Sequence, residues 1–353
     1  MWWIFLISSA FALQCPEFMC TSAEVPLGPG QCVYYNNSQY SLSPCEDQRI
    51  SYCDSQTHPE NVSCTIPPQA PTINIAYPGE PCVFDLNCVQ SICLKGICKG
   101  LPINSACTQD AQCDVGLFCF SSKCAPQIAI GQPGCTKDSQ CVNNAGCNVD
   151  TGTCVAYLSF PPGTILSSCT NNYNPLCSSQ ACATVQGKSY CQAQVKSLSS
   201  LPAYCTDSSN CPAYFDIAIG AQVNTQCVCG LNGFGDSFCS LAPGDEPFAN
   251  STLWLSKWYA SQSIKMCHTS MRTGNLCMKT YWDYNSYIAF QYYATYSQNY
   301  PLYQFNDQCV RNIYTSAFWE LEEEYMNSIQ PADNDDNSAV IAAIGGFLSL
   351  IAF

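Results

Sequence analysis

The sequence predicts a tandem array of small disulfide-rich modules, each built of loops and a short β-hairpin, followed by a disulfide-stapled α-helical domain. The first observation is the presence of 30 cysteines among 353 residues, an even number at a density typical of disulfide scaffolds. The second is that their spacing repeats along the middle of the chain. The third is that the segments between cysteines are too short and too polar to form a conventional core. Disulfides, each worth roughly 2–4 kcal/mol, must therefore supply most of the stability.

The N-terminal residues predict entry into the secretory pathway. Residues 1–12 hold an apolar stretch that ends in Ala10-Phe11-Ala12, the small-x-small pattern read by signal peptidase, so we expect a cleaved signal peptide. No Lys or Arg follows Met1, and a buried N-terminal strand is the alternative. The cysteine content itself requires an oxidising compartment, because cytosolic thiol systems keep cysteines reduced. We therefore expect an extracellular protein.

Cysteine spacing divides the chain into segments. Residues 13–77 form an N-terminal module of six cysteines with a Pro-rich linker, residues 78–200 carry four-cysteine repeats, and residues 201–245 contain a Cys-x-Cys motif. The six N-terminal cysteines are Cys15, Cys20, Cys32, Cys45, Cys53 and Cys64. The regular repeats are Cys82-x5-Cys88-x4-Cys93-x4-Cys98, Cys107-x5-Cys113-x5-Cys119-x4-Cys124 and Cys135-x5-Cys141-x5-Cys147-x6-Cys154. A looser fourth runs from Cys169 to Cys191, and Cys205-x5-Cys211 opens a fifth.

Residues 246–331 predict a helical, aromatic-rich domain. Apolar residues recur at helical spacing over Asp307–Met326, with Asp307 as the expected N-cap, and two further helices are expected around Thr252–Met266 and Tyr281–Tyr296. The cysteines that could staple these helices are Cys267, Cys277 and Cys309.

Two side-chain sets stand out in this helical domain. Its tyrosines are expected to pack against neighbouring helices, and a sugar- or protein-binding face is the alternative. They are Tyr281, Tyr284, Tyr287, Tyr292, Tyr293, Tyr296, Tyr300 and Tyr303. An acidic run is expected to form a solvated helix face rather than a cation-collecting patch. It consists of Glu320, Glu322, Glu323 and Glu324.

The C-terminal segment, residues 332–353, predicts an anchor signal. An acidic spacer precedes Ala339–Phe353, which contains no charged or amide side chain and falls short of the ~20 residues that a membrane-spanning helix needs. A polar spacer followed by an apolar tail is typical of a glycosylphosphatidylinositol signal. We expect lipid attachment, with Asn327 and Asn337 as candidates, and a short C-terminal transmembrane helix is the alternative. The expected location is thus the extracellular face of the plasma membrane.

Charge limits the partners. The formal net charge of −14 arises from 26 acidic and 12 basic residues, a field that disfavours nucleic acid and bare anionic lipid. The expected partners are the membrane, through the anchor, and an extracellular protein or glycan. Three N-x-[ST] sequons, at Asn36, Asn61 and Asn250, predict glycans on exposed loops.

The regular repeats share the motif Cys-x2-Asp-x2-Cys. It stands at Cys82-Asp85-Cys88, Cys107-Asp110-Cys113 and Cys135-Asp138-Cys141, and the second copy adds Gly116-Leu117-Phe118-Cys119. The motif resembles the N-terminal cysteine-rich domain of the Dickkopf family over roughly residues 78–200. Serial copies between a signal peptide and a hydrophobic tail are similar to the cysteine-rich surface proteins of ciliated protists. The resemblance implies disulfide knots on a displayed protein, whereas in vertebrates the module belongs to a secreted Wnt antagonist.

We predict that each regular repeat closes internally, first cysteine to third and second to fourth, out of the three connectivities that four cysteines permit. The expected pairs are Cys82–Cys93, Cys88–Cys98, Cys107–Cys119, Cys113–Cys124, Cys135–Cys147 and Cys141–Cys154.

Few residues point to chemistry. The two histidines, His58 and His268, stand outside any zincin, triad or thiol-protease motif, so we predict no catalysis, no cofactor and no metal. Cys227 and Cys229 could chelate a soft metal as thiolates, but disulfides are expected in an oxidising compartment. The recurrent aspartate of the repeats is expected to accept backbone N–H bonds in a turn. A calcium site is the alternative, although it needs six to eight oxygen ligands.

The predicted function is that of a non-enzymatic extracellular protein of the cell surface with a coat, adhesion or recognition role. The alternative is a secreted soluble ligand or inhibitor of Dickkopf-like or protease-inhibitor type. Retention on the membrane discriminates between them.

Overall fold

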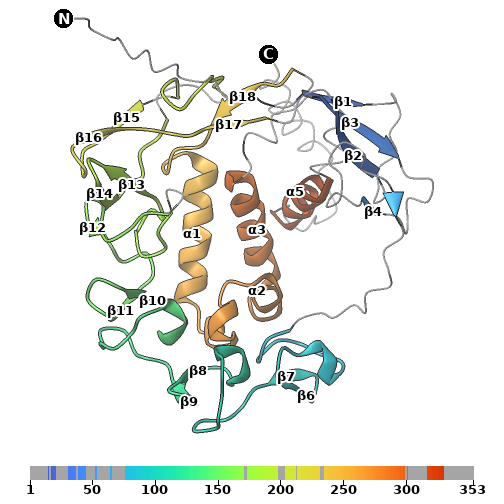
Figure 1. Cartoon of the computed structure of the whole chain (residues 1–353), viewed down its shortest axis with the longest axis vertical. Helices are drawn as coiled ribbons and strands as arrows, with labels where there is room; N and C mark the ends of the chain where they lie inside the picture. The colour runs from blue at the N-terminus through green and yellow to red at the C-terminus, as the bar shows by residue number, and fades with distance from the viewer. Residues whose placement is uncertain are drawn as a thin grey trace, which may run out of the picture.

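The computed structural model shows small disulfide-bonded modules in tandem and a C-terminal helical region. The structure describes residues 15, 17–20, 31–36, 39–44, 52–53, 64–65, 76–170, 173–197, 203–211, 213–230, 234–298, 300 and 316–329. Figure 1 shows that the modules follow one another in an arc around a central group of helices. We name them the first (76–99), second (100–126), third (127–157), fourth (158–193) and fifth (203–240) modules.

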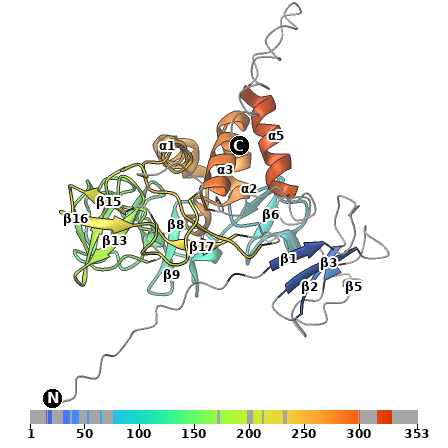
Figure 2. The ribbon, with the colours of Figure 1, turned by 90° about the horizontal axis from the view of Figure 1, so that it is seen from above.

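The N-terminal segment forms a separate small sheet. Strand β3 (Gln39–Pro44) lies between β1 (Glu17–Cys20), which is parallel to it, and β2 (Gln31–Asn36), which is antiparallel. Strands β4 (Tyr52–Cys53) and β5 (Cys64–Thr65) form an antiparallel pair. Figures 1 and 2 place the three-stranded sheet on the side of the helices opposite the fourth and fifth modules.

Each regular module consists of a one-turn 3₁₀ helix followed by a β-hairpin. The elements are η1 (Asp85–Asn87), β6 (Ile92–Leu94) and β7 (Ile97–Lys99); η2 (Asp110–Gln112), β8 (Leu117–Phe120) and β9 (Lys123–Pro126); and η3 (Asp138–Gln140), β10 (Ala145–Asn148) and β11 (Thr153–Ala156). In the first hairpin both loop residues, Lys95 and Gly96, have positive φ (54° and 82°). Such two-residue loops match the right-handed twist of the strands, which explains the tight turn.

The fourth and fifth modules vary the same plan. The fourth is a three-stranded sheet in the order β12 (Ile165–Leu166), β14 (Lys188–Cys191), β13 (Cys182–Val185). The fifth has two hairpins, β15 (Ala213–Asp216) with β16 (Ala221–Asn224), and β17 (Cys227–Cys229) with β18 (Ser237–Cys239).

The helical region contains the largest core cluster of the described residues. Its helices are α1 (Glu246–Ala260), η4 (Ser263–Met266), η5 (Thr269–Met271), α2 (Asn275–Tyr281), α3 (Tyr284–Gln298) and α5 (Ser316–Ile329). Trp258, Ile264 and Met278 are at most 1 % exposed, and Tyr157 and Leu176, from the third and fourth modules, join the same cluster. The third and fourth modules therefore share this core with the helices.

The helix boundaries differ from the sequence prediction. The first helix spans Glu246–Ala260 rather than Thr252–Met266, because Pro247 is tolerated in a first turn and residues 263–266 form the separate η4. Helix α2 was not predicted, and its seven residues are too few to show a clear helical period. Asp307 and Cys309 lie outside the described residues.

Candidate functional site

The disulfides define the framework of every module. The structure joins first cysteine to third and second to fourth in the three regular modules, which is the expected order, with Cα separations of 5.5 to 5.9 Å. The other two modules repeat this order. Their pairs are Cys169–Cys182, Cys177–Cys191, Cys205–Cys227 and Cys211–Cys239. The fifth four-cysteine set is therefore complete, although a long insertion separates its second and third cysteines.

The Cys-x-Cys motif connects two distant parts of the chain. Cys227 bonds Cys205 within the fifth module, whereas Cys229 bonds Cys15, 214 residues away. Both sulfurs are consumed in disulfides, so neither offers the thiolate that a soft metal needs. Cys15 therefore pairs outside the N-terminal module rather than with another of its six cysteines.

The recurrent aspartate ties each 3₁₀ turn to its hairpin. The Oδ1 atoms of Asp85, Asp110 and Asp138 accept backbone N–H bonds at 2.7, 3.0 and 2.8 Å. The carboxylates thus accept backbone N–H bonds as expected, but the donor is the third cysteine of the module, eight or nine residues further on, rather than a neighbour in the turn.

A second contact that recurs from module to module was not predicted from the sequence. The amide side chain directly before the second cysteine closes the turn itself: Asn87 Oδ1 accepts the N–H of Val83 at 3.0 Å, and Gln112 Oε1 accepts that of Thr108 at 2.6 Å. Gln140 and Asn210 make the equivalent bonds to Thr136 (2.6 Å) and Thr206 (3.0 Å). The signal was an Asn or Gln at one fixed position in four modules.

The fifth module shows how this scheme tolerates change. Ser208 occupies the position of the aspartate, and its Oγ accepts the N–H of Cys227, the third cysteine, at 3.1 Å. A hydroxyl oxygen can replace a carboxylate here because the contact needs only one acceptor.

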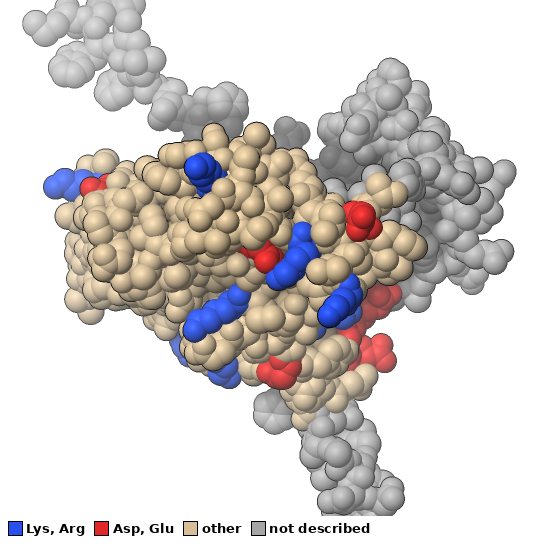
Figure 3. Space-filling view, turned by 90° about the horizontal axis from the view of Figure 1, so that it is seen from below, with Lys and Arg blue, Asp and Glu red and all other residues tan. Residues whose placement is uncertain are grey.

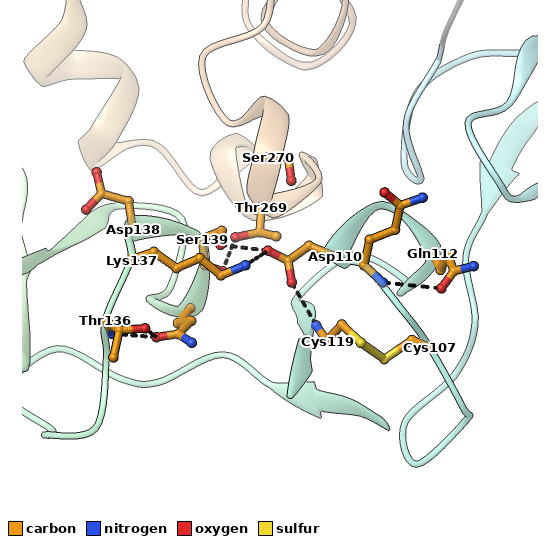
Figure 4. A network of polar contacts seen from close by, with 12 residues as sticks. Cys107, Asp110, Gln112, Cys119, Thr136, Lys137, Asp138, Ser139, Thr269 and Ser270 are labelled. Carbon is orange, nitrogen blue, oxygen red and sulfur yellow. Dashed lines mark hydrogen bonds and ion pairs between the residues drawn. A yellow bond between two sulfur atoms is a disulfide. The ribbon is translucent and has the colours of Figure 1, made fainter. Parts of the chain in front are cut away.

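The other carboxylate oxygen of Asp110 links the second module to the third (Figure 4). Asp110 Oδ2 accepts bonds from Lys137 Nζ and Ser139 Oγ of the third module, both at 2.7 Å. Burial opposes ionisation of Asp110, but the bonds from Lys137, Ser139 and Cys119 outweigh it and lower its pKa. The second and third modules are thus joined by a charge-assisted contact.

His268 is a structural residue of the same junction. Its Nδ1 accepts the N–H of Ser270 at 3.1 Å, so Nε2 carries the hydrogen and donates it to the Asp110 carbonyl at 3.0 Å. The side chain is fully buried, and this burial lowers the pKa of His268. A neutral, enclosed imidazole with both nitrogens occupied cannot reach a substrate. His58 lies outside the described residues.

Arg272 fixes the third module to the helical region. Its side chain is 7 % exposed and donates to the carbonyls of Ala145 (2.6 Å) and Asp138 (2.8 Å) and to the Tyr157 hydroxyl (3.1 Å). A buried guanidinium needs such acceptors because an unpaired charge in the interior is costly.

Three modules form hydrogen bonds with the segment around Arg272. Asn143, from the third, donates through Nδ2 to the carbonyls of Ile264 (2.8 Å) and Cys267 (2.7 Å). His268 contacts the second module, and the Tyr281 hydroxyl donates to the Gly79 carbonyl of the first. We call residues 263–282 the docking segment. The Cys267–Cys277 disulfide closes its loop.

The tyrosines of α3 pack between helices, which favours the structural interpretation of this set. Tyr292 stacks on Tyr325 of α5 with ring centroids 4.5 Å apart, and the Tyr293 and Tyr325 hydroxyls are 3.0 Å apart. Burial raises the pKa of Tyr292. Tyr284 is half exposed, and Tyr303 lies outside the described residues.

The acidic run of α5 is mainly on the surface. Glu320, Glu323 and Glu324 are exposed, whereas Glu322 is partly buried. This arrangement is that of the expected solvated helix face.

One sequon differs from expectation. Asn250 is partly buried on α1 and lies beside Tyr293, rather than on an exposed loop. Asn36 ends β2. The lipidation candidate Asn327 is exposed near the end of α5, whereas Asn61 and Asn337 lie outside the described residues. Among the described residues, no helix combines the length and the apolar character needed to cross a bilayer.

Comparison with protein-family models, with curated proteins and with solved structures finds no match to the chain. The geometry of the modules and their junctions therefore carries the functional argument.

Proposed function

We propose that this chain is a non-catalytic extracellular protein displayed on the cell surface, with a coat, adhesion or recognition role. The observation that carries the proposal is the docking of three disulfide-bonded modules onto the docking segment through Asn143, His268, Arg272 and Tyr281. Local disulfides and buried polar junctions together give a rigid body that resists unfolding. Such a framework suits an oxidising, protease-containing exterior.

The surface also supports a role in contacts. Figure 3 shows a face on which charged side chains are scattered over a mostly uncharged surface. At the first module, Val83, Phe84 and Leu86 are 75 %, 65 % and 83 % exposed. Adjacent exposed apolar side chains of this kind are typical of protein contact sites.

A lipid anchor following α5 is the proposed means of display. Helix α5 packs onto α3 through Tyr325 and ends at Ile329. The acidic spacer and the apolar tail, residues 332–353, follow it in the sequence. Transamidase signals have this order of spacer and tail. Attachment at Asn337 would leave α5 intact, whereas attachment at Asn327 would remove its last two residues.

The test is retention on intact cells. Cells that express the full chain are surface-biotinylated and then treated with a phosphatidylinositol-specific phospholipase. The intact mass of the released protein is measured. The proposal predicts a surface-labelled protein that is released without Ala339–Phe353, and the mass identifies the attachment residue. A membrane-bound protein that keeps Phe353 would contradict the anchor and indicate a short transmembrane helix. A protein found only in the medium would favour the soluble ligand instead.

A further inference from the structure

The 3₁₀ turn of the first module holds three apolar side chains in solvent. Val83, Phe84 and Leu86 stand at the first, second and fourth positions after Cys82, and they are 65–83 % exposed. Single exposed apolar residues are common on proteins, but several within one turn indicate a contact site. Figure 1 places this module, with β6 and β7, at the lower right of the arc.

The fold of a module does not require apolar residues at these three positions. Three other modules have mainly polar residues there and still form the same turn. The equivalent residues are Thr108, Gln109 and Ala111 in the second module, Thr136, Lys137 and Ser139 in the third, and Thr206, Asp207 and Ser209 in the fifth.

The valine also lacks a hydrogen bond that stabilises the neighbouring turns. In the second and third modules, the hydroxyls of Thr108 and Thr136 donate to the side-chain oxygens of Gln112 and Gln140, both at 3.2 Å. Val83 has no hydroxyl with which to make this bond. The local structure of the turn therefore does not account for an apolar residue at this position.

The same positions of the turn already form a contact between modules. In the third module, Lys137 and Ser139 donate to the Asp110 carboxylate of the second module at 2.7 Å. Phe84 and Leu86 occupy the equivalent positions of the first module. This side of the turn is therefore a surface at which modules of this chain meet, and in the first module that surface is apolar.

The charge of the first module permits the approach of a second copy. Two chains that each carry a net charge of −14 repel one another. Within residues 76–99, however, Glu80 and Asp85 are balanced by Lys95 and Lys99, so the first module has no net formal charge. Contact through this module therefore brings two apolar surfaces together without net repulsion between the modules that touch.

We propose that the turn of the first module binds the same turn of a second copy of this chain. A two-fold arrangement presents the same side chains from both partners and is the commonest symmetry of protein oligomers. Few side chains are buried on each partner, so the contact belongs to the small, transient class below ~1,200 Å², and we expect a micromolar dissociation constant. The inference rests on the proposed coat or adhesion role, to which it gives a partner, but it does not require the anchor.

The test is analytical ultracentrifugation of the full oxidised chain from about 1 to 300 μM, where we expect a reversible dimer. Val83→Thr, Phe84→Gln and Leu86→Ala, combined in one variant, install the residues of the second module and should weaken dimerisation at least roughly tenfold. The melting temperature should be unchanged or higher, because the introduced hydroxyl can donate to Asn87. Ile217→Gln is the matched control, since it removes an 86 % exposed apolar side chain from the fifth module and should leave dimerisation unchanged.

A pair of charge variants tests whether the two turns face each other. Phe84→Lys and Phe84→Asp introduce the residue types that the third and fifth modules carry at this position, as Lys137 and Asp207, so both are compatible with the turn. Each variant alone should be monomeric, because like charges meet across the two-fold axis. An equimolar mixture should associate more tightly than either variant alone.

Four results would overturn the inference. The first is a wild type that stays monomeric over the whole concentration range, and the second is a triple variant that dimerises like the wild type. The third is a mixture of charge variants that associates no more tightly than either alone. The fourth is a monomeric wild type that binds phosphatidylcholine vesicles through these residues, which would indicate a membrane contact instead. Because the assay uses purified protein, its failure is distinguishable from failure of surface display, which is measured on cells.

Discussion

Replacement of Arg272 by Met is expected to cost about 3 kcal/mol of unfolding free energy. The substitution keeps a long apolar stem and removes the donors that face Ala145 O, Asp138 O and the Tyr157 hydroxyl at 2.6, 2.8 and 3.1 Å. Each bond from a charged donor contributes roughly 1.5–3 kcal/mol.

Two effects reduce the gross loss. Asp138 O keeps the N–H of Cys141 as a second donor, and the Tyr157 hydroxyl keeps its bond to the Asp138 carboxylate. The variant also no longer buries a guanidinium, which relieves a desolvation cost of several kcal/mol. These two effects reduce the loss from the ~5–9 kcal/mol of three bonds with a charged donor to a net of about 3 kcal/mol.

The assay is chemical unfolding of the oxidised full chain, followed by far-ultraviolet circular dichroism of the helices and evaluated by linear extrapolation. Lys265→Met is the control, because Lys265 is an exposed cation of the same docking segment and its loss should change stability by no more than about 0.5 kcal/mol. If both variants unfold at the same denaturant concentration with the same slope, Arg272 does not hold the third module and the reasoning is refuted.

Three further predictions concern protons, metal and disulfides. Because burial lowers the pKa of His268, this residue takes up a proton at a higher pH in the unfolded chain than in the folded one. The free energy of unfolding should therefore be unaffected by His268 above pH ~6.5 and should fall below that pH by up to ~1.4 kcal/mol per pH unit. Burial raises the pKa of Glu80, so this carboxyl group makes the protein more stable as the pH falls, the opposite of His268. The measurement is therefore the difference in the pH dependence of stability between the wild type and His268→Gln. Identical pH profiles of the two proteins would contradict the role of His268. A calcium chelator should leave the protease resistance of the modules unchanged, since the aspartate Oδ1 atoms already accept N–H bonds, and a large loss would instead indicate a metal site. Peptide mapping without reduction should recover Cys15 joined to Cys229, and a crosslink between two regular modules would contradict the internal pairing.

Local features of the modules could be predicted from the sequence because their contacts are short in sequence. Cys82 and Cys93 are separated by 11 residues, and the interval between cysteines repeats from module to module. The sequence predicted that the recurrent aspartate accepts backbone N–H bonds. The donor was not, since it depends on how the hairpin folds back over the 3₁₀ turn.

The docking of modules onto helices could not be predicted in this way. Arg272 reaches Ala145 across 127 residues, and Asn143 reaches Cys267 across 124, with backbone carbonyls as the acceptors. Every residue has a carbonyl, so the sequence contains no pattern that marks these partners. Helix α2 was missed for a related reason, because seven residues closed by a disulfide depend on tertiary packing more than on helical periodicity.

Hydrogen exchange of the docking segment in the Asn143→Leu variant tests most directly whether the modules and helices form one body. Asn143 is 3 % exposed and contributes two bonds, at 2.8 and 2.7 Å, to carbonyls more than 120 residues away. At ~1 kcal/mol per bond, their loss should accelerate exchange of amides in residues 263–282 by about thirtyfold. Gln132→Ala, which alters an exposed side chain of the same module, should leave these amides unchanged. Faster exchange in the docking segment only for Asn143→Leu would agree with the docked arrangement. If exchange is faster only in the third module, and residues 263–282 are as protected as in the wild type, the modules fold independently of the helices. That result would contradict the docked arrangement.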